Sequence, residues 1–136
     1  MRDLNGELSV LNRLLKEGKC CASALLQMGL LIRGEENPQL VRAVSGLCNG
    51  LHRGLLCGAL SGGCCMMALF TAQKDETAEL SRELTDWFVS KYGGVDCAAI
   101  TGNSPGKKNA LCPLIVEAVY QTAKSILSEH GKINEE

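Results

Sequence analysis

The fold is decided around the stretch Gly54-Leu55-Leu56-Cys57-Gly58-Ala59-Leu60-Ser61-Gly62-Gly63-Cys64-Cys65, which sets three cysteines among residues with almost no side chain. Residues about one turn apart share a face of a helix, so Cys57, Ser61 and Cys64 would form a narrow stripe of thiols and small groups. Each glycine inside a helix costs about 1 kcal/mol relative to alanine, so the glycines of this stretch need a local reason. They predict either a tight crossing of helices or room for a ligand at Cys57.

Length and composition define the class of protein. The chain has 136 residues, of which 46% are hydrophobic, and a formal net charge of -1. This is enough to bury a core without disulfides, and it indicates neither a nucleic-acid partner nor a disordered chain. The first residues are mixed and polar, which argues against an export signal, and no apolar run reaches the roughly 20 residues of a membrane span. We expect one cytoplasmic domain over 1–136, with a frayed tail over 131–136.

Eight cysteines are unusual for such a chain. In a reducing compartment this number points to metal binding, cluster ligation or redox chemistry. No two cysteines stand in a Cys-x-x-Cys motif, so the spacings match neither a zinc finger, a thioredoxin-type site nor covalent haem attachment. Any site must therefore gather cysteines that are distant in the sequence.

The hydrophobic pattern is helical throughout. Apolar residues recur every three or four positions, and no stretch alternates as a strand would. Asn37 followed by Pro38 is typical of a helix start, and Gly93 of a helix end. The predicted helices cover about 4–16, 19–33, 38–54, 57–73, 75–92 and 112–129, with a short turn at Cys97 and a loop over 102–109. The sequence predicts an all-α bundle of five or six helices.

Four of the cysteines fall near predicted helix starts. Cys21 follows Gly18, Cys57 opens the central helix, Cys97 follows Asp96, and Cys112 precedes Pro113. Backbone N–H groups at a helix start favour negative charge, so we expect these thiols to be shifted towards thiolate. Any one of them could equally be an inert core cysteine.

The segments around these cysteines follow the order and spacing of a known family. They are Cys21-Ala22-Ser23-Ala24-Leu25-Leu26, Cys57-Gly58-Ala59-Leu60-Ser61-Gly62, Asp96-Cys97 and Cys112-Pro113-Leu114-Ile115-Val116. Together they resemble the bacterial and archaeal family named C-GCAxxG-C-C, whose members are described as redox-active. The resemblance extends from about Lys16 to Ala123. The family motif has glycine before its central cysteine, whereas here Leu56 precedes Cys57 and Gly58 intervenes before Ala59.

This resemblance implies a helical, cytoplasmic protein of anaerobes in which Cys21, Cys57, Cys97 and Cys112 form a redox or metal site. Four thiolates suit a 2Fe–2S or 4Fe–4S cluster, or one zinc or iron ion, and a cluster would pass electrons to a partner protein. Gly58 and Gly62 would let backbone N–H groups approach the cluster sulfurs. Cys64, two turns after Cys57, is the expected additional ligand.

Two other functions are open at this point. Two of the four thiols could cycle between dithiol and disulfide. Alternatively, the small-residue stripe could pack a partner subunit, and a homodimer is compatible with the composition. Cys20, Cys48 and Cys65 are expected to be core or surface thiols. The chain carries no recognisable acid–base pair or phosphate loop, which argues against a conventional hydrolase or transferase.

Overall fold

The computed structural model describes residues 4–101 and 105–133, and in these residues it is an all-α bundle, as predicted. The helices are α1 (Leu4–Lys16), α2 (Cys21–Arg33), α3 (Pro38–Ala43), α4 (Gly58–Ala68), α5 (Lys74–Tyr92), α6 (Cys97–Thr101) and α7 (Pro105–Glu129). Between α3 and α4 lie a 3₁₀ turn, η1 (Val44–Leu47), and a tight turn, η2 (Gly50–Gly54). None of the described helices is long and apolar enough to cross a membrane.

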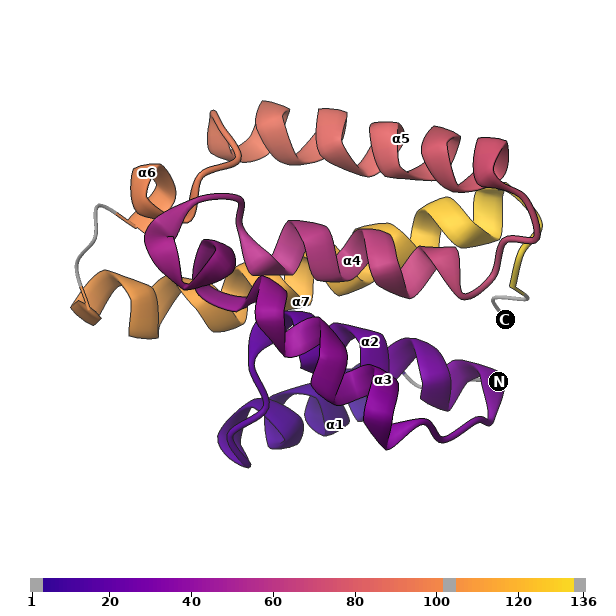
Figure 1. Cartoon of the computed structure of the whole chain (residues 1–136), viewed down its shortest axis with the longest axis horizontal. Coiled ribbons are helices and arrows are strands. Elements are labelled where there is room, and N and C mark those ends of the chain that lie inside the picture. Colours follow the sequence, from indigo (N-terminus) through magenta and orange to yellow (C-terminus); the bar gives the residue numbers. More distant parts are fainter. Residues whose placement is uncertain (1–3, 102–104, 134–136) are drawn as a thin grey trace.

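Helix α4 runs through the centre of the bundle. Figure 1 shows it between α5 above and α2 below, with α7 behind it, α3 crossing in front of α2 and α1 below α2. The most extensive contacts of α4 are with α2, α7 and α5. The stretch that carries the glycines and cysteines therefore touches most of the molecule.

The glycines of α4 allow close helix crossings. A Cβ atom at Gly62 would lie 2.6 Å from the Ala22 Cα atom on α2. A Cβ atom at Gly63 would lie 2.6 Å from the Val119 Cγ1 atom on α7. Neither distance is tolerated between real atoms, so the tight-crossing interpretation of these two glycines is confirmed.

Helix α5 matches the periodicity of its sequence. Leu80, Leu84 and Phe88 face the core and are buried. Gly93 ends the helix in a left-handed conformation, with φ at 80° and its N–H donating to the Val89 carbonyl. The helix begins at Lys74, with Gln73 as its cap, because the Glu76 carboxylate accepts hydrogen bonds from the N–H groups before it.

The connection from α3 to α4 differs from the predicted long helix. Asn37 caps α3 as expected, its side-chain oxygen accepting from the Leu40 N–H at 3.1 Å. The α-helix ends at Ala43 and passes into the 3₁₀ turn η1, and the chain leaves the helical conformation at Asn49, Gly50, Leu51 and His52, where the backbone is left-handed. Helix α4 is also shorter than predicted and ends at Ala68.

The last helix begins earlier than predicted. Residues 105–109, expected in a loop, belong to α7, and the rest of that loop lies outside the described residues. Pro113 stands inside α7, where it removes one intrahelical hydrogen bond without ending the helix. Cys112 is therefore within the helix, which corrects its predicted place at a helix start. The predicted tail falls partly on residues 134–136, which are also not described.

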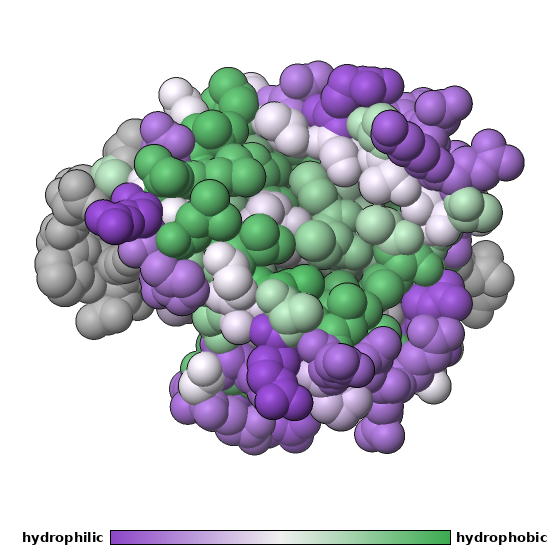
Figure 2. Space-filling model, viewed as in Figure 1, coloured by the Kyte–Doolittle hydropathy of each residue, from purple (hydrophilic) through white to green (hydrophobic). Residues whose placement is uncertain are grey.

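Two further features concern the surface and the cysteines. Figure 2 shows hydrophobic residues exposed between two hydrophilic edges of this face. The exposed large apolar side chains include Leu51 in η2 and Leu55 and Leu56 in the segment just before α4. Cys20 and Cys48, expected as separate thiols, form a disulfide that joins the start of α2 to the end of η1.

Candidate functional site

A short antiparallel bridge brings two of the four cysteines together. Leu56 pairs with Asp96, while the Cys57 N–H donates to the Val95 carbonyl at 2.7 Å and the Cys97 N–H to the Leu55 carbonyl at 2.6 Å. Side chains alternate between the two faces of such a pair, so both cysteines project to the side opposite Leu56. Cys57 and Cys97 are 7% and 5% exposed, against 40% for Leu56. The bridge thus directs two thiols inwards from segments 40 residues apart in the sequence.

Cys21 joins this pair from the first turn of α2. The backbone N–H groups of Asn49 and Ala22 lie close enough to its sulfur to lower the pKa of the thiol. Asn49 is held at a φ of 53°, a left-handed conformation that asparagine adopts more easily than most residues. A Cβ atom at Gly58 would lie 2.7 Å from the Cys21 sulfur, so this glycine lets the start of α4 approach the thiol.

Cys112 completes the group from α7. The four cysteines line one cavity of about 20 Å³. Its other lining residues are mostly small or apolar: Asn49, Gly58, Ala59, Ile100, Thr101, Ile115 and Val116. The Thr101 hydroxyl donates to the Cys97 carbonyl at 2.8 Å, and none of the described residues that line the cavity is acidic or basic. The structure therefore brings together all four cysteines that the sequence singled out.

Burial controls the protonation of these thiols. Burial, with smaller contributions from the neighbouring Cys57 and Cys112 thiols, raises the pKa of Cys21 from 9.0 to about 11, although the N–H groups of Asn49 and Ala22 act in the opposite direction. Burial also raises the pKa of Cys57, although the N–H groups of Ala59 and Leu60 at the start of α4 act in the opposite direction. The expected shift of these two thiols towards thiolate is therefore wrong, because desolvation outweighs the helix-start hydrogen bonds.

The donor set fits a soft metal ion. Four thiols meet in an apolar cavity, and backbone N–H groups already point at two of the sulfurs, as they do around metal-bound thiolates. A space of about 10–15 Å³ takes one water molecule, so this cavity has room for one ion. As placed, no three acidic, histidine or cysteine groups among the described residues converge closely enough to hold a metal. The thiols would have to draw together around the ion.

The remaining cysteines lie elsewhere. Cys64 does not line the cavity; its thiol lies within hydrogen-bond reach of Ser81 on α5. Gly62 packs on Ala22, while Gly58 is the glycine that touches the site. Sequence reasoning missed Asn49 and Thr101. Asn49 could have been found from the Asn-Gly pair at 49–50, which is typical of a left-handed turn.

Comparison with known proteins identifies a family. A model of the family described as "Putative redox-active protein (C_GCAxxG_C_C)" matches residues 19–126, which include every residue that lines the cavity. No curated protein and no solved structure matches the chain. Since the family match covers most of the sequence, the chain belongs to the C_GCAxxG_C_C family of redox-active proteins.

Proposed function

We propose that this protein is a small electron carrier in which Cys21, Cys57, Cys97 and Cys112 hold one metal ion as thiolates. Iron is the ion that would give such a site redox activity, because zinc in the same ligand set does not change oxidation state. A bound iron ion would supply a one-electron couple tuned by the surrounding N–H groups and by burial. The electron would pass to a partner protein.

The observation that carries the proposal is the convergence of four thiols from separate elements on one apolar cavity. They come from α2, the start of α4, α6 and α7, segments with no Cys-x-x-Cys spacing among them. A purely structural role would not require four thiols to share one cavity. The family's redox description agrees with a site of this composition.

Protonation separates metal binding from thiol exchange at this site. A thiol with a pKa of about 11 is almost entirely protonated at neutral pH and is a weak nucleophile. A metal cation takes the place of the thiol protons and balances the negative charges that burial disfavours. The raised pKa of Cys21 thus favours a metal over a dithiol that attacks other sulfur compounds.

The cavity volume supports a single ion over a cluster. About 20 Å³ accommodates one ion, whereas a cluster with its own sulfides would have to push the lining apart. Ile115 and Val116 on α7 are 3% and 1% exposed, so expansion on that side would disturb the core. A single tetrahedral ion would instead require the four thiols to draw together around it, which does not enlarge the cavity.

The test is metal and acid-labile sulfide analysis, with an absorption spectrum, on protein purified without oxygen. We expect about one iron per chain without sulfide, and charge-transfer bands that disappear in the Cys57→Ser variant. The Cys65→Ser variant is the matched control, since Cys65 is a free thiol that does not line the cavity. Iron and sulfide in equal amounts would replace the single ion by a cluster. A protein that binds no added iron or zinc, with a Cys21–Cys57 disulfide after mild oxidation, would establish thiol–disulfide exchange instead.

A further inference from the structure

We propose that the Cys20–Cys48 disulfide is a second redox centre, which an external dithiol reduces by entering the pocket between α2 and α3. This centre uses neither the cavity nor the cysteines of the proposed metal site. The inference therefore stands independently of the proposed function.

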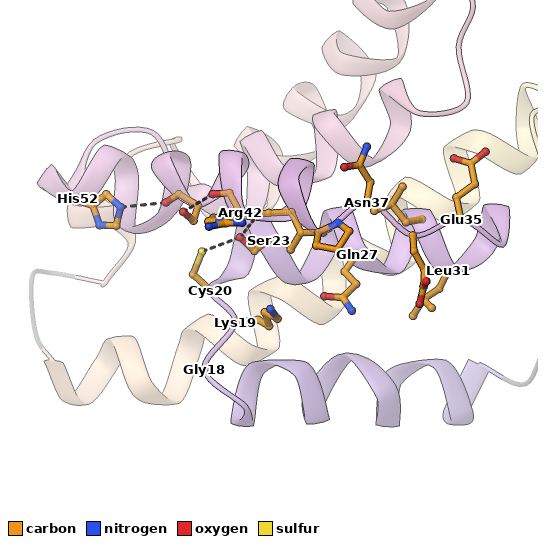
Figure 3. Close-up of a pocket in the computed structure, with 15 residues that line it drawn as sticks. Gly18, Lys19, Cys20, Ser23, Gln27, Leu31, Glu35, Asn37, Arg42 and His52 are labelled. Carbon is orange, nitrogen blue, oxygen red and sulfur yellow. Dashed lines mark hydrogen bonds between the residues drawn. The ribbon is translucent and has the colours of Figure 1, made fainter.

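The pocket gives access to one sulfur of the pair. It has a volume of about 710 Å³ and is lined by residues from the start of α2 to η2, among them Cys20, Ser23, Gln27, Arg42 and His52. Figure 3 shows Cys20 near one end of it, with its sulfur directed towards Ser23. Cys20 is half-buried, whereas Cys48 is 1% exposed and does not line the pocket. An incoming thiolate can therefore reach the Cys20 sulfur and not the Cys48 sulfur.

The surroundings of Cys20 also suit its reduced form. The Ser23 Oγ atom lies 3.6 Å from the Cys20 sulfur. Its own proton is directed to the Val41 carbonyl, at 2.8 Å, so the hydroxyl oxygen is left as an acceptor. A disulfide sulfur has no proton to donate, whereas a Cys20 thiol would donate to this oxygen. The contact becomes a hydrogen bond only after reduction.

The backbone allows the two sulfurs to separate. Cys20 precedes α2 in an extended conformation, with ψ at 169°, and makes no side-chain capping hydrogen bond. Cys48 follows η1 and is also extended, with ψ at 153°. Because both residues stand at the ends of elements, the bond can open without unwinding a helix.

The reaction is a two-step thiol–disulfide exchange. A thiolate of the external dithiol attacks the Cys20 sulfur, which forms a mixed disulfide, breaks the Cys20–Cys48 bond and leaves its electron pair on Cys48. The second thiolate of the reductant then attacks the reductant's other sulfur, the one bound to Cys20 in the mixed disulfide, and releases Cys20 as a thiolate. Two electrons move from the dithiol to the protein, the dithiol becomes a disulfide, and its two protons are balanced by two taken up at Cys20 and Cys48.

The test follows the kinetics of reduction by dithiothreitol in the native protein, with alkylation and mass spectrometry of the Cys20 and Cys48 peptides. We expect a rate that rises linearly with dithiothreitol concentration while the circular dichroism stays native. A rate that levels off, or reduction only after the helical signal is lost, would overturn the proposal, because the disulfide would then open only through unfolding. Failure of Cys20 and Cys48 to pair again on oxidation would overturn it too.

A reciprocal pair of variants tests which sulfur is attacked. The Cys48→Ser variant leaves Cys20 at the pocket, and the Cys20→Ser variant leaves Cys48 buried. We expect 5,5′-dithiobis(2-nitrobenzoic acid) to modify Cys20 in Cys48→Ser at least about tenfold faster than Cys48 in Cys20→Ser, followed by mass spectrometry of the peptides that carry these two positions, because the six other free cysteines also react. Equal rates in two folded variants would contradict entry through the pocket. Because only these two peptides are followed, a failure of the metal site leaves the result readable.

Discussion

The two ends of α4 are built on different principles. At its C-terminal half, Gly62, Gly63, Met66 and Met67 are buried against α2, α5 and α7, and the close contacts are between regular helices. At its start, Cys57 meets a left-handed turn and an isolated bridge, both outside regular helix. The C-terminal half of α4 depends on side-chain packing, while the start of α4 depends on backbone conformation. We therefore expect the C-terminal half of α4 to contribute most to the stability of the fold and the start of α4 to carry the chemistry.

The largest effect is expected at the packed end, from Gly62→Ala. The new methyl group would lie 2.6 Å from the Ala22 Cα atom, so α2 and α4 would have to move apart. We expect the free energy of unfolding to fall by about 2–3 kcal/mol, even though alanine has the higher helix propensity. Urea denaturation followed by circular dichroism measures the change.

The control for this substitution is Gly46→Ala in η1, because no atom lies within 4 Å of the added methyl group. It should change the unfolding free energy by less than about 1 kcal/mol. If both variants are equally stable, the helix crossing is not the reason for the glycine, and the contrast between the two ends of α4 fails.

The regular helices around α4 are the part of the fold that the sequence predicts best. The boundaries of α1, the cap at Asn37 and the end of α5 at Gly93 follow from local signals, and the structure confirms them. Such signals act within a few residues, and a core-facing stripe requires only the right period. The glycines of α4 indicated a close crossing, although the partner residues Ala22 and Val119 could not be read from the sequence.

The second prediction concerns the turn at the other end, where Gly50 has a φ of 59°. A Cβ atom there would lie 2.3 Å from the Leu55 backbone nitrogen, so Gly50→Ala should distort the turn that holds Asn49. We expect a loss of about 1–2 kcal/mol in unfolding free energy. Because the Asn49 N–H would leave the Cys21 sulfur, iodoacetamide should label Cys21 several times faster, measured by mass spectrometry.

Gly34→Ala is the matched control for the turn. Gly34 has a similar φ of 71° at the other end of α2, but no atom lies within 4 Å of an added Cβ. It carries the same backbone strain without the clash, so Cys21 labelling should stay at the wild-type rate. Faster labelling in both variants would mean that general destabilisation, and not the turn, exposes the thiol.

The site could be predicted only in part, for physical reasons. The identities of Cys21, Cys57, Cys97 and Cys112 came from their segments, and the structure brings them to one cavity. The bridge between Leu56 and Asp96 and the disulfide between Cys20 and Cys48 join residues far apart in the chain, and no local pattern encodes such pairings. The sign of the pKa shifts also depends on burial, which exists only once the chain has folded.

The smallest effect is a loss of stability in alkaline solution, and it tests the burial of Cys21 directly. Because the folded-state pKa of about 11 is above the ordinary value of 9.0, the folded protein prefers the neutral thiol. The contribution of Cys21 to stability is therefore fully present below pH 9 and is lost as the pH rises towards about 11. We expect reduced, metal-free protein to lose about 0.5–1 kcal/mol through this group by about pH 9.5, relative to about pH 8. The pKa values of Cys57 and Tyr92 are also raised, so these groups also contribute to the alkaline loss. The unfolding free energy is therefore measured by urea denaturation at the two pH values for wild type and for Cys21→Ser, and the contribution of Cys21 is the difference between their two losses. An identical alkaline loss in both proteins would mean that Cys21 is solvated, and the argument for a metal-driven deprotonation at the cysteine end of α4 would lose its basis.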